Sequence, residues 1–260
     1  MTIEPGHAIA GAATGFVVGL TGVGGGALMT PILLLVFGVA PQTAVATDLW
    51  FAAITKCVAL PLHQRGGRVD WQVVRRMWLG SLPVGLLVVA MVSAGTKVGR
   101  IDWLTKAVGV AVLVAATGLL LAPVLQRRMR ASRIEMPERF KARQPMLTVA
   151  AGAMLGLLVA LTSVGAGALG TVLMLALYPL RMTPQRLVAT DIAHAIPLAI
   201  VAGTGYLLSG MVDGGMLLGM LTGSVPAVLL GSALANRLSA PWLRGAVAVV
   251  LTLVAVKMLA

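Results

Sequence analysis

The sequence predicts an all-α polytopic membrane protein built from two homologous halves. Of its 260 residues, 58% are hydrophobic and only 11% are charged, whereas soluble domains carry about 25% charged residues. Several apolar segments reach the ~20 residues that a helix needs to cross a bilayer. In addition, four sequence motifs occur twice in the same order. Together these observations predict two sets of membrane helices.

The net charge of +12 does not indicate a nucleic-acid partner. The basic residues lie in loops between apolar segments, as the positive-inside rule expects. A single cysteine, Cys57, excludes an intramolecular disulfide framework. Because the apolar runs are long and continuous, a β-barrel is excluded as well. The first apolar segment follows no basic n-region, so we expect it to stay in the mature protein.

The repeated motifs define the two halves. TGVGGGAL at 21–28 recurs as TSVGAGAL at 162–169. PQ at 41–42 with ATD at 46–48 recurs at 184–185 and 189–191, GRVD at 67–70 recurs as GMVD at 210–213, and GSLP at 80–83 recurs as GSVP at 223–226. The spacing between the two copies is the same for the last three motifs and slightly shorter for the first, which one two-residue insertion explains. We predict an N-terminal repeat over 1–125, a basic cytoplasmic linker over 126–145 and a C-terminal repeat over 146–260.

Each half begins with a long apolar segment, 8–37 or 146–178, which the glycine motif interrupts. Three further apolar segments follow in each half and are expected to be transmembrane helices: 43–62, 77–94 and 103–123, then 183–208, 214–234 and 243–259. Helical arms over 8–20 and 27–37 would be about 20 Å and 16 Å long at 1.5 Å per residue. Each arm is therefore expected to reach about the middle of the membrane and stop.

Two topologies fit this pattern. If the leading segments cross the membrane, each half has four crossings and the repeats are parallel. If each leading segment is a re-entrant hairpin with its tip at the glycines, each half has three crossings and the repeats are inverted. The hairpin topology puts four arginines on the same side as the linker, whereas the crossing topology puts them outside: Arg181, Arg186, Arg237 and Arg244. The positive-inside rule favours the hairpins.

The glycine motif at 21–28 matches a loose dinucleotide-binding fingerprint, but that fingerprint requires a soluble βαβ unit around it. Inside a membrane segment, glycines allow a sharp turn and leave backbone N–H groups without helical partners. The helix after each tip points an N-terminus with about +0.5 of a charge towards it. This predicts an anion site in the middle of the bilayer. The alternative is that the glycines are helix-packing surfaces, which the recurrence of the motif makes less favoured.

The predicted substrate-binding residues come from the two tips, with one lysine from an apolar segment. They are Thr21, Gly22, Val23, Gly24, Gly25, Gly26, Thr162, Ser163, Val164, Gly165, Gly167 and Lys56. The glycines supply backbone N–H groups, the hydroxyls supply further donors, and Lys56 supplies a positive charge. Alternatively, Lys56 pairs with an aspartate instead of meeting the substrate.

Ionisable residues within membrane segments are functional candidates. Asp48 and Asp191 are equivalent, each follows a threonine, and His194 stands one helical turn after Asp191. We predict coupling or gating roles for Thr47, Asp48, Thr190, Asp191 and His194. The alternatives are helix N-capping for the two aspartates and a hydrogen-bonded core position for the histidine.

These residues carry a family resemblance. TGVGGG at 21–26, Pro31, PQTAVATD at 41–48 and the two-fold repetition resemble the TauE/SafE family, the sulfite exporter or toluenesulfonate uptake permease family. The resemblance covers nearly the whole chain. It implies a multi-pass transporter in a bacterial inner membrane that moves a small sulfur-containing anion such as sulfite, sulfoacetate or a sulfonate. The second half departs from the glycine-rich form at Ser163 and Ala166, which leaves open whether both tips contact substrate equally.

The leading hypothesis is therefore a secondary transporter for a sulfur oxyanion that works by alternating access, with an anion channel or uniporter as the alternative. An enzyme is not expected, because no cluster has metal-ligand spacing and no nucleophile has a base beside it. We expect no cofactor, metal or nucleic acid. The expected partners are the anion and the lipid bilayer, with H⁺ or Na⁺ as the coupling ion, and the sequence is compatible with a homodimer. Asp48 and Asp191 would repel an anion if both were ionised, so we expect them to be protonated or cation-bound during part of the cycle.

Overall fold

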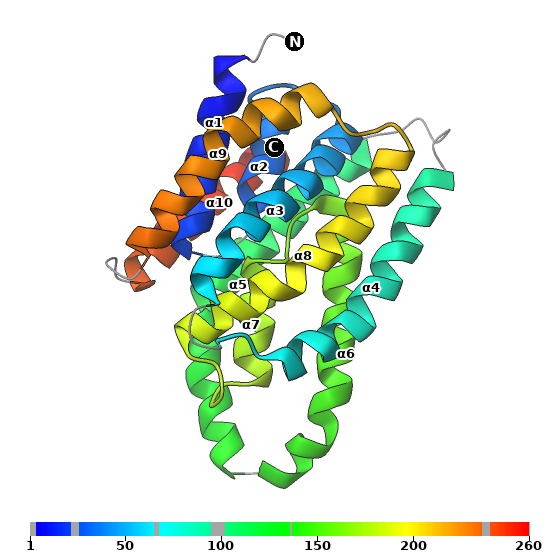
Figure 1. Cartoon of the computed structure of the whole chain (residues 1–260). Helices are drawn as coiled ribbons and strands as arrows, with labels where there is room; N and C mark the ends of the chain where they lie inside the picture. The colour runs from blue at the N-terminus through cyan, green and yellow to red at the C-terminus, as the bar shows by residue number, and fades with distance from the viewer. Residues whose placement is uncertain are drawn as a thin grey trace.

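The computed structural model describes residues 4–21, 26–64, 68–94, 102–135, 137–235 and 240–259. In these ranges the chain forms ten α-helices and no strand (Figure 1). The helices are α1 (Pro5–Thr21), α2 (Gly26–Leu35), α3 (Pro41–His63), α4 (Trp71–Ala94), α5 (Asp102–Glu135), α6 (Pro137–Thr162), α7 (Ala168–Leu177), α8 (Pro184–Leu208), α9 (Gly214–Leu234) and α10 (Ala240–Leu259). The predicted all-α class is confirmed.

Six stretches of the described helices are long and apolar enough to cross a membrane. They are Pro41–His63, Trp71–Val92, Thr105–Arg128, Lys141–Thr162, Pro184–Leu208 and Gly214–Leu234. Ala168–Leu177 and Val247–Leu259 are apolar but shorter. The outward faces carry large apolar side chains, including Leu86, Leu120 and Leu253, which suit a lipid environment. The protein is therefore a multi-pass membrane protein.

Each leading segment contributes two helices, α1 and α2 in the first half and α6 and α7 in the second, and the start of the first helix lies near the end of the second. In the first, the ring of His7 at the start of α1 lies 4.5 Å, centroid to centroid, from the ring of Phe37 just after α2. In the second, the Gln144 side chain near the start of α6 donates to the carbonyl oxygen of Leu177 at the end of α7, at 2.7 Å. The beginning of each first arm thus lies beside the end of the second arm.

The two helices of the second leading segment are unequal. α6 has 26 residues, about 39 Å, and begins within the predicted linker, whereas α7 has 10 residues, about 15 Å. The segment 163–167 between them is not helical, and Gly165 in it lies against Leu158 and Val159 of α6. Most of the predicted linker over 126–145 is also helical, as continuations of α5 and α6 (Figure 1).

The helices pair across the two predicted halves. α1 packs along α9, α4 packs along α6, and α3 packs against α8 in the centre of the bundle (Figure 1). If each helix is replaced by its counterpart in the other predicted half, the α1–α9 pair becomes the α6–α4 pair. Each of these pairs contains one helix from each predicted half, so the two halves are interlocked.

Glycines bring the backbones of the paired helices into direct contact. A Cβ atom at Gly15 of α1 would lie 2.7 Å from the carbonyl oxygen of Ser224 in α9. A Cβ atom at Gly80 of α4 would overlap the carbonyl oxygen of Val149 in α6. Small residues allow transmembrane helices to approach this closely. Glycines within the helices therefore serve close helix packing. This is the role that was considered above as the alternative for the tip glycines.

We predict that Gly80→Ala destabilises the protein by about 1–3 kcal/mol, the usual cost of overpacking. The added methyl group would force α4 away from α6, and the melting temperature of the purified protein in detergent should fall. Gly245→Ala in α10 is the matched control, because a Cβ atom there meets no atom within 4 Å and alanine favours helix. Equal melting temperatures for the two variants would contradict the close packing of α4 on α6.

Candidate functional site

A cavity of about 20 Å³ lies in the centre of the bundle. It is lined by Ala27, Leu49, Ala52, Lys56, Val159, Ser163, Gly165, Ala166, Gly167, Ala195 and Ala199. This volume is enough for one ordered water molecule. The wall is apolar apart from the Lys56 ammonium, the Ser163 hydroxyl and the backbone of segment 163–167.

The starts of α2 and α7 meet at this cavity. Ala27 is the second residue of α2, and Gly167 is the N-cap of α7; both line the cavity. A helix N-terminus carries about +0.5 of a charge. Two such ends lie at the cavity beside the Lys56 ammonium, whose charge is compensated by Asp191.

The first glycine motif is described only at its ends. Thr21 ends α1 and donates its hydroxyl to the carbonyl oxygen of Val17 at 2.7 Å, and Gly26 begins α2. Four predicted substrate-binding residues lie outside the described residues: Gly22, Val23, Gly24 and Gly25.

The second tip holds a buried hydroxyl on a strained backbone. Ser163 has a left-handed φ of 57°, which is uncommon for a residue other than glycine. Its side chain is buried, with the residue 6% exposed. Its Oγ makes no hydrogen bond of good geometry, but it lies close enough to the Asp48 carboxyl group to interact with it. Gly165 follows with φ 126°, which its lack of a Cβ allows. Strained conformations of this kind cluster at binding and catalytic sites.

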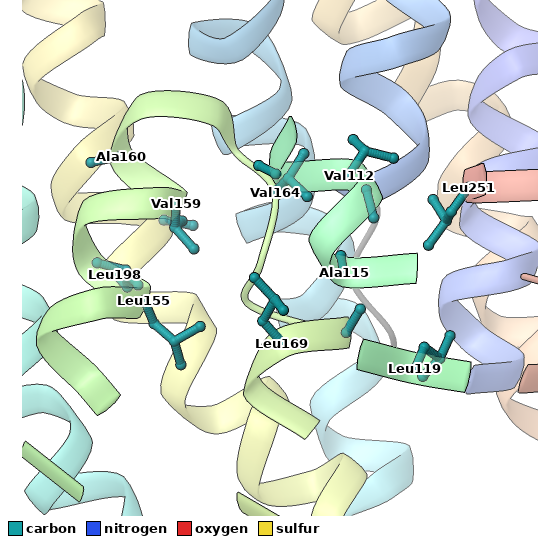
Figure 2. Close-up of a cluster of buried hydrophobic side chains, with 14 of the residues drawn as sticks. Val112, Ala115, Leu119, Leu155, Val159, Ala160, Val164, Leu169, Leu198 and Leu251 are labelled. Carbon is teal, nitrogen blue, oxygen red and sulfur yellow. The ribbon is translucent and has the colours of Figure 1, made fainter. Parts of the chain in front are cut away.

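Two other predicted binding residues anchor this tip instead of facing the cavity. The Thr162 hydroxyl donates to the carbonyl oxygen of Leu158 at 2.6 Å and accepts from the Val164 N–H at 3.1 Å. Figure 2 shows the Val164 side chain in the hydrophobic cluster that also contains Val112 and Leu169. Neither Thr162 nor Val164 is among the residues that line the cavity.

Lys56 of α3 pairs with Asp191 of α8 inside the bundle. Lys56 Nζ lies 3.4 Å from Asp191 Oδ2, and each side chain is 2% exposed. This is longer than the roughly 2.7–2.9 Å of a strong charge-assisted hydrogen bond. Asp191 Oδ1 has no hydrogen-bond partner. The pair is therefore loose, although each charge compensates the other in a buried position.

Asp48 is fully buried and accepts a hydrogen bond from α2. Its Oδ2 accepts from the Thr30 hydroxyl, and its Oδ1 has no partner. Asp48 and Asp191 each lie seven residues after the first residue of their helix. The N-capping alternative is therefore wrong for both aspartates; in α8 that role belongs to Thr183, whose side chain accepts from the Arg186 N–H.

His194 occupies a hydrogen-bonded position between α8 and α4. Its Nε2 lies 3.0 Å from Ser81 Oγ, and its carbonyl oxygen accepts from the Trp78 indole at 3.1 Å. Nδ1 has no partner. This arrangement matches the core alternative for His194, and its ring does not line the cavity.

Thr47 and Thr190 make equivalent contacts across the two halves. Thr47 Oγ1 accepts from the backbone N–H of Asp213 at 3.1 Å, and Thr190 Oγ1 accepts from that of Asp70 at 3.0 Å. These bonds attach the starts of α9 and α4 to the central helices α3 and α8.

Two polar partners, Thr30 and Ser81, were not predicted from the sequence, and Asp70 was given no role. All three could have been found from the repeat, because each has an equivalent polar residue in the second half, at Thr171, Ser224 and Asp213. Ser224 Oγ lies 3.1 Å from Thr55 Oγ1 in the buried contact between α9 and α3. Within the described residues, no group of three His, Cys, Asp or Glu side chains could hold a metal ion.

Comparisons with known proteins assign the chain to a family. The profile of the sulfite exporter TauE/SafE family matches residues 7–258. The probable membrane transporter protein YjnA of Bacillus subtilis (strain 168) is 35% identical over 227 residues, covering 86% of this chain and 87% of YjnA. YdhB of the same organism, also named a probable membrane transporter protein, is 24% identical over 233 residues, covering 90% of this chain and 91% of YdhB. No solved structure matches the chain. The protein belongs to the sulfite exporter TauE/SafE family of membrane transporters.

Proposed function

We propose that the protein is a secondary transporter that moves a small sulfur-containing anion, of the sulfite, sulfonate or sulfoacetate type, by alternating access. One observation carries the proposal: a central cavity receives two helix N-termini, the Lys56 ammonium and the Ser163 hydroxyl. A compact oxyanion accepts hydrogen bonds on several sides and suits such a set of donors. The name of the family points to the same class of substrate.

The size of the cavity supports alternating access. About 20 Å³ accommodates one water molecule, whereas sulfite has four heavy atoms. An anion can bind there only if the walls move apart, so in this conformation the proposed site is too small for its substrate. Opening to one side at a time is the mechanism expected of a transporter with internal repeats.

Substrate and Asp191 would compete for Lys56. The lysine is neutralised by Asp191 at 3.4 Å, so an anion that takes its place leaves an uncompensated carboxylate in a buried position. That carboxylate is costly unless it takes up a proton or a cation. Asp48, with one oxygen unpartnered, would add to the repulsion if ionised. We therefore propose H⁺ or Na⁺ coupling through Asp48 and Asp191.

Contacts between loops support the hairpin topology and inverted repeats. Arg181 follows α7 and lies 2.6 Å, Nε to Oδ2, from Asp70, which precedes α4. The crossing topology would put these two loops on opposite sides of the membrane, whereas the hairpin topology puts both on the linker side. The positive-inside rule then makes the linker side cytoplasmic. The exchange of helix pairs between α1–α5 and α6–α10 supports the division into repeats over 1–125 and 146–260.

The first prediction from this site concerns binding. Sulfite, sulfate and methanesulfonate are added separately to the purified protein, and the melting temperature is followed. At least one anion should raise it, since a ligand at 100 times its Kd adds about 2.7 kcal/mol of stability. Ser163→Ala should weaken the binding of that anion by about 1–3 kcal/mol, because one buried hydrogen-bond donor is lost.

Lys56 requires a paired design, because Lys56→Met alone leaves Asp191 unpaired and should cost about 3–5 kcal/mol of stability. Lys56→Met with Asp191→Asn removes both charges and should recover most of that loss, yet show no anion-dependent shift. Lys106→Met, at an exposed position of α5, is the matched control and should keep the shift. Anion binding that survives in the folded double variant would show that the anion binds elsewhere.

The second prediction concerns coupling. In proteoliposomes, anion flux by the wild type should depend on a proton or sodium gradient. Asp48→Asn and Asp191→Asn each remove one carboxylate that must be neutralised when an anion is bound. Each variant should therefore carry anion down its own gradient with reduced dependence on pH or sodium. If Asp48→Asn keeps the pH and sodium dependence of the wild type, Asp48 has no part in coupling.

A further inference from the structure

A second ion-pair cluster lies outside the cavity, at the end of the bundle where α4 and α8 begin. Asp70 is 2% exposed, and both oxygens of its carboxylate are engaged by Arg181, at 2.6 Å from Nε and 2.8 Å from Nη2. Arg186 Nη2 lies 3.1 Å from the same carboxylate. Arg181 Nη1 also donates to Gln72 at 2.8 Å. One buried carboxylate thus holds two arginines.

This cluster joins the starts of α4 and α8 to the segment that follows α7. Asp70 and Gln72 stand at the start of α4, Arg181 follows α7, and Arg186 lies in the first turn of α8. α7 itself runs from Gly167 at the cavity towards the cluster, a length of about 15 Å. Arg76 of α4 adds a contact to the Tyr178 hydroxyl at the end of α7, at 3.3 Å.

The equivalent end of the other half lacks the charged partners. By the spacing of the repeats, Gly38 and Thr43 take the places of Arg181 and Arg186, and Gly215 and Gly219 take the places of Gln72 and Arg76. Among the residues that the structure describes near the start of α1, His7 Nδ1 lies 3.7 Å from Glu4 Oε2.

Asp213, the counterpart of Asp70, keeps the backbone contacts. It accepts from the Met216 N–H at 2.9 Å and so caps α9, and its own N–H donates to Thr47. The two ends therefore share a helix cap and a threonine contact, and they differ in the arginine cluster.

The cluster is connected to the cavity by a short chain of contacts. The Asp70 N–H donates to Thr190 Oγ1 at 3.0 Å. Thr190 precedes Asp191, whose carboxylate holds Lys56 at the cavity wall. A shift of α8 that releases Lys56 therefore acts directly on the position of Asp70.

We infer that Asp70, Arg181 and Arg186 form a gate that keeps the linker-side entrance to the cavity closed, and that the opposite entrance opens more readily. The inference rests on the proposed transport function. To open the linker side, α4 must part from α7 and α8. This separates the buried Asp70 carboxylate from Arg181 and Arg186, whose side chains are 41% and 37% exposed, and an unpaired buried carboxylate is costly. Opening the other side breaks the Thr47–Asp213 bond, and the part of the chain that the structure describes shows no equivalent arginine cluster there.

Cysteine accessibility tests the gate without any substrate. Ala52 and Ala195 line the cavity, and each is replaced separately by cysteine after Cys57→Ser. A membrane-impermeant methanethiosulfonate reagent is applied to inverted vesicles and to right-side-out vesicles. The linker face is identified by a separate Arg75→Cys reporter at an exposed position.

Two gate variants are compared with the wild-type gate in this background. Asp70→Asn removes the charge but keeps a residue that caps helices well, and Arg181→Gln with Arg186→Gln removes both cations. Each should increase labelling from the linker face about fivefold or more, the lower end of ordinary conformational coupling, and decrease labelling from the opposite face. Arg68→Gln with Arg75→Gln is the matched control, since both residues are exposed and outside the cluster, and it should change neither rate.

Opposite changes on the two faces would support the gate. Unchanged rates in both gate variants would overturn it. An equal rise on both faces would overturn it too, since that result describes a loosened bundle and not a shifted equilibrium. Because the assay contains no anion, these outcomes do not depend on whether sulfite or another anion is the substrate, which the melting-temperature experiment decides separately.

Discussion

The loss of helical structure at 163–167 is the constraint on which the rest of the architecture depends. Backbone outside a helix is tolerated at membrane depth only where protein buries it or a polar cavity faces it. Here Thr162 satisfies part of the segment by hydrogen bonds, and Val164 inserts into the hydrophobic cluster (Figure 2). The close pairing of α4 with α6 covers the first arm from outside. The bundle is therefore organised around a short stretch of backbone that it must shield.

The polar atoms near the centre share an unusual property. Asp48 Oδ1, Asp191 Oδ1, His194 Nδ1 and Ser163 Oγ are all buried and make no hydrogen bond of good geometry. Folded proteins leave few such atoms, and each one costs free energy. Each of these side chains except Ser163 has another polar atom that is paired, so the fold positions the group while leaving part of its capacity unused. That is the pattern expected of groups that receive an anion, a proton or water during part of a cycle.

The division of each leading segment into two helices could be predicted from the sequence, because a glycine cluster inside an apolar run disfavours a continuous helix. Repetition singled out Asp48 and Asp191, since a polar residue recurring in an apolar segment needs a reason. Pairing of Lys56 with an aspartate was one of the alternatives that the sequence offered, and the structure confirms it. The sequence could not identify Asp191 as the partner, because tertiary packing and not local pattern brings α3 to α8. The start of α6 within the predicted linker was also not foreseen, because residues 137–145 are polar and basic and carry no apolar pattern. The arginines at 181 and 186 suggested only a membrane side, and their shared carboxylate emerged from the fold.

The glycine contacts between α1 and α9 and between α4 and α6 have a consequence for motion. Helices that touch backbone to backbone leave little room to slide or tilt separately, because interlocked surfaces deform in discrete steps and not continuously. The bodies that stay intact are then mixed pairs, each with one helix from either half. If the first half rocked as a unit against the second, the glycine contacts of both pairs would have to break at once. If instead the mixed pairs move about the central α3 and α8, these contacts stay intact. The moving parts of the molecule then do not coincide with the repeats in its sequence.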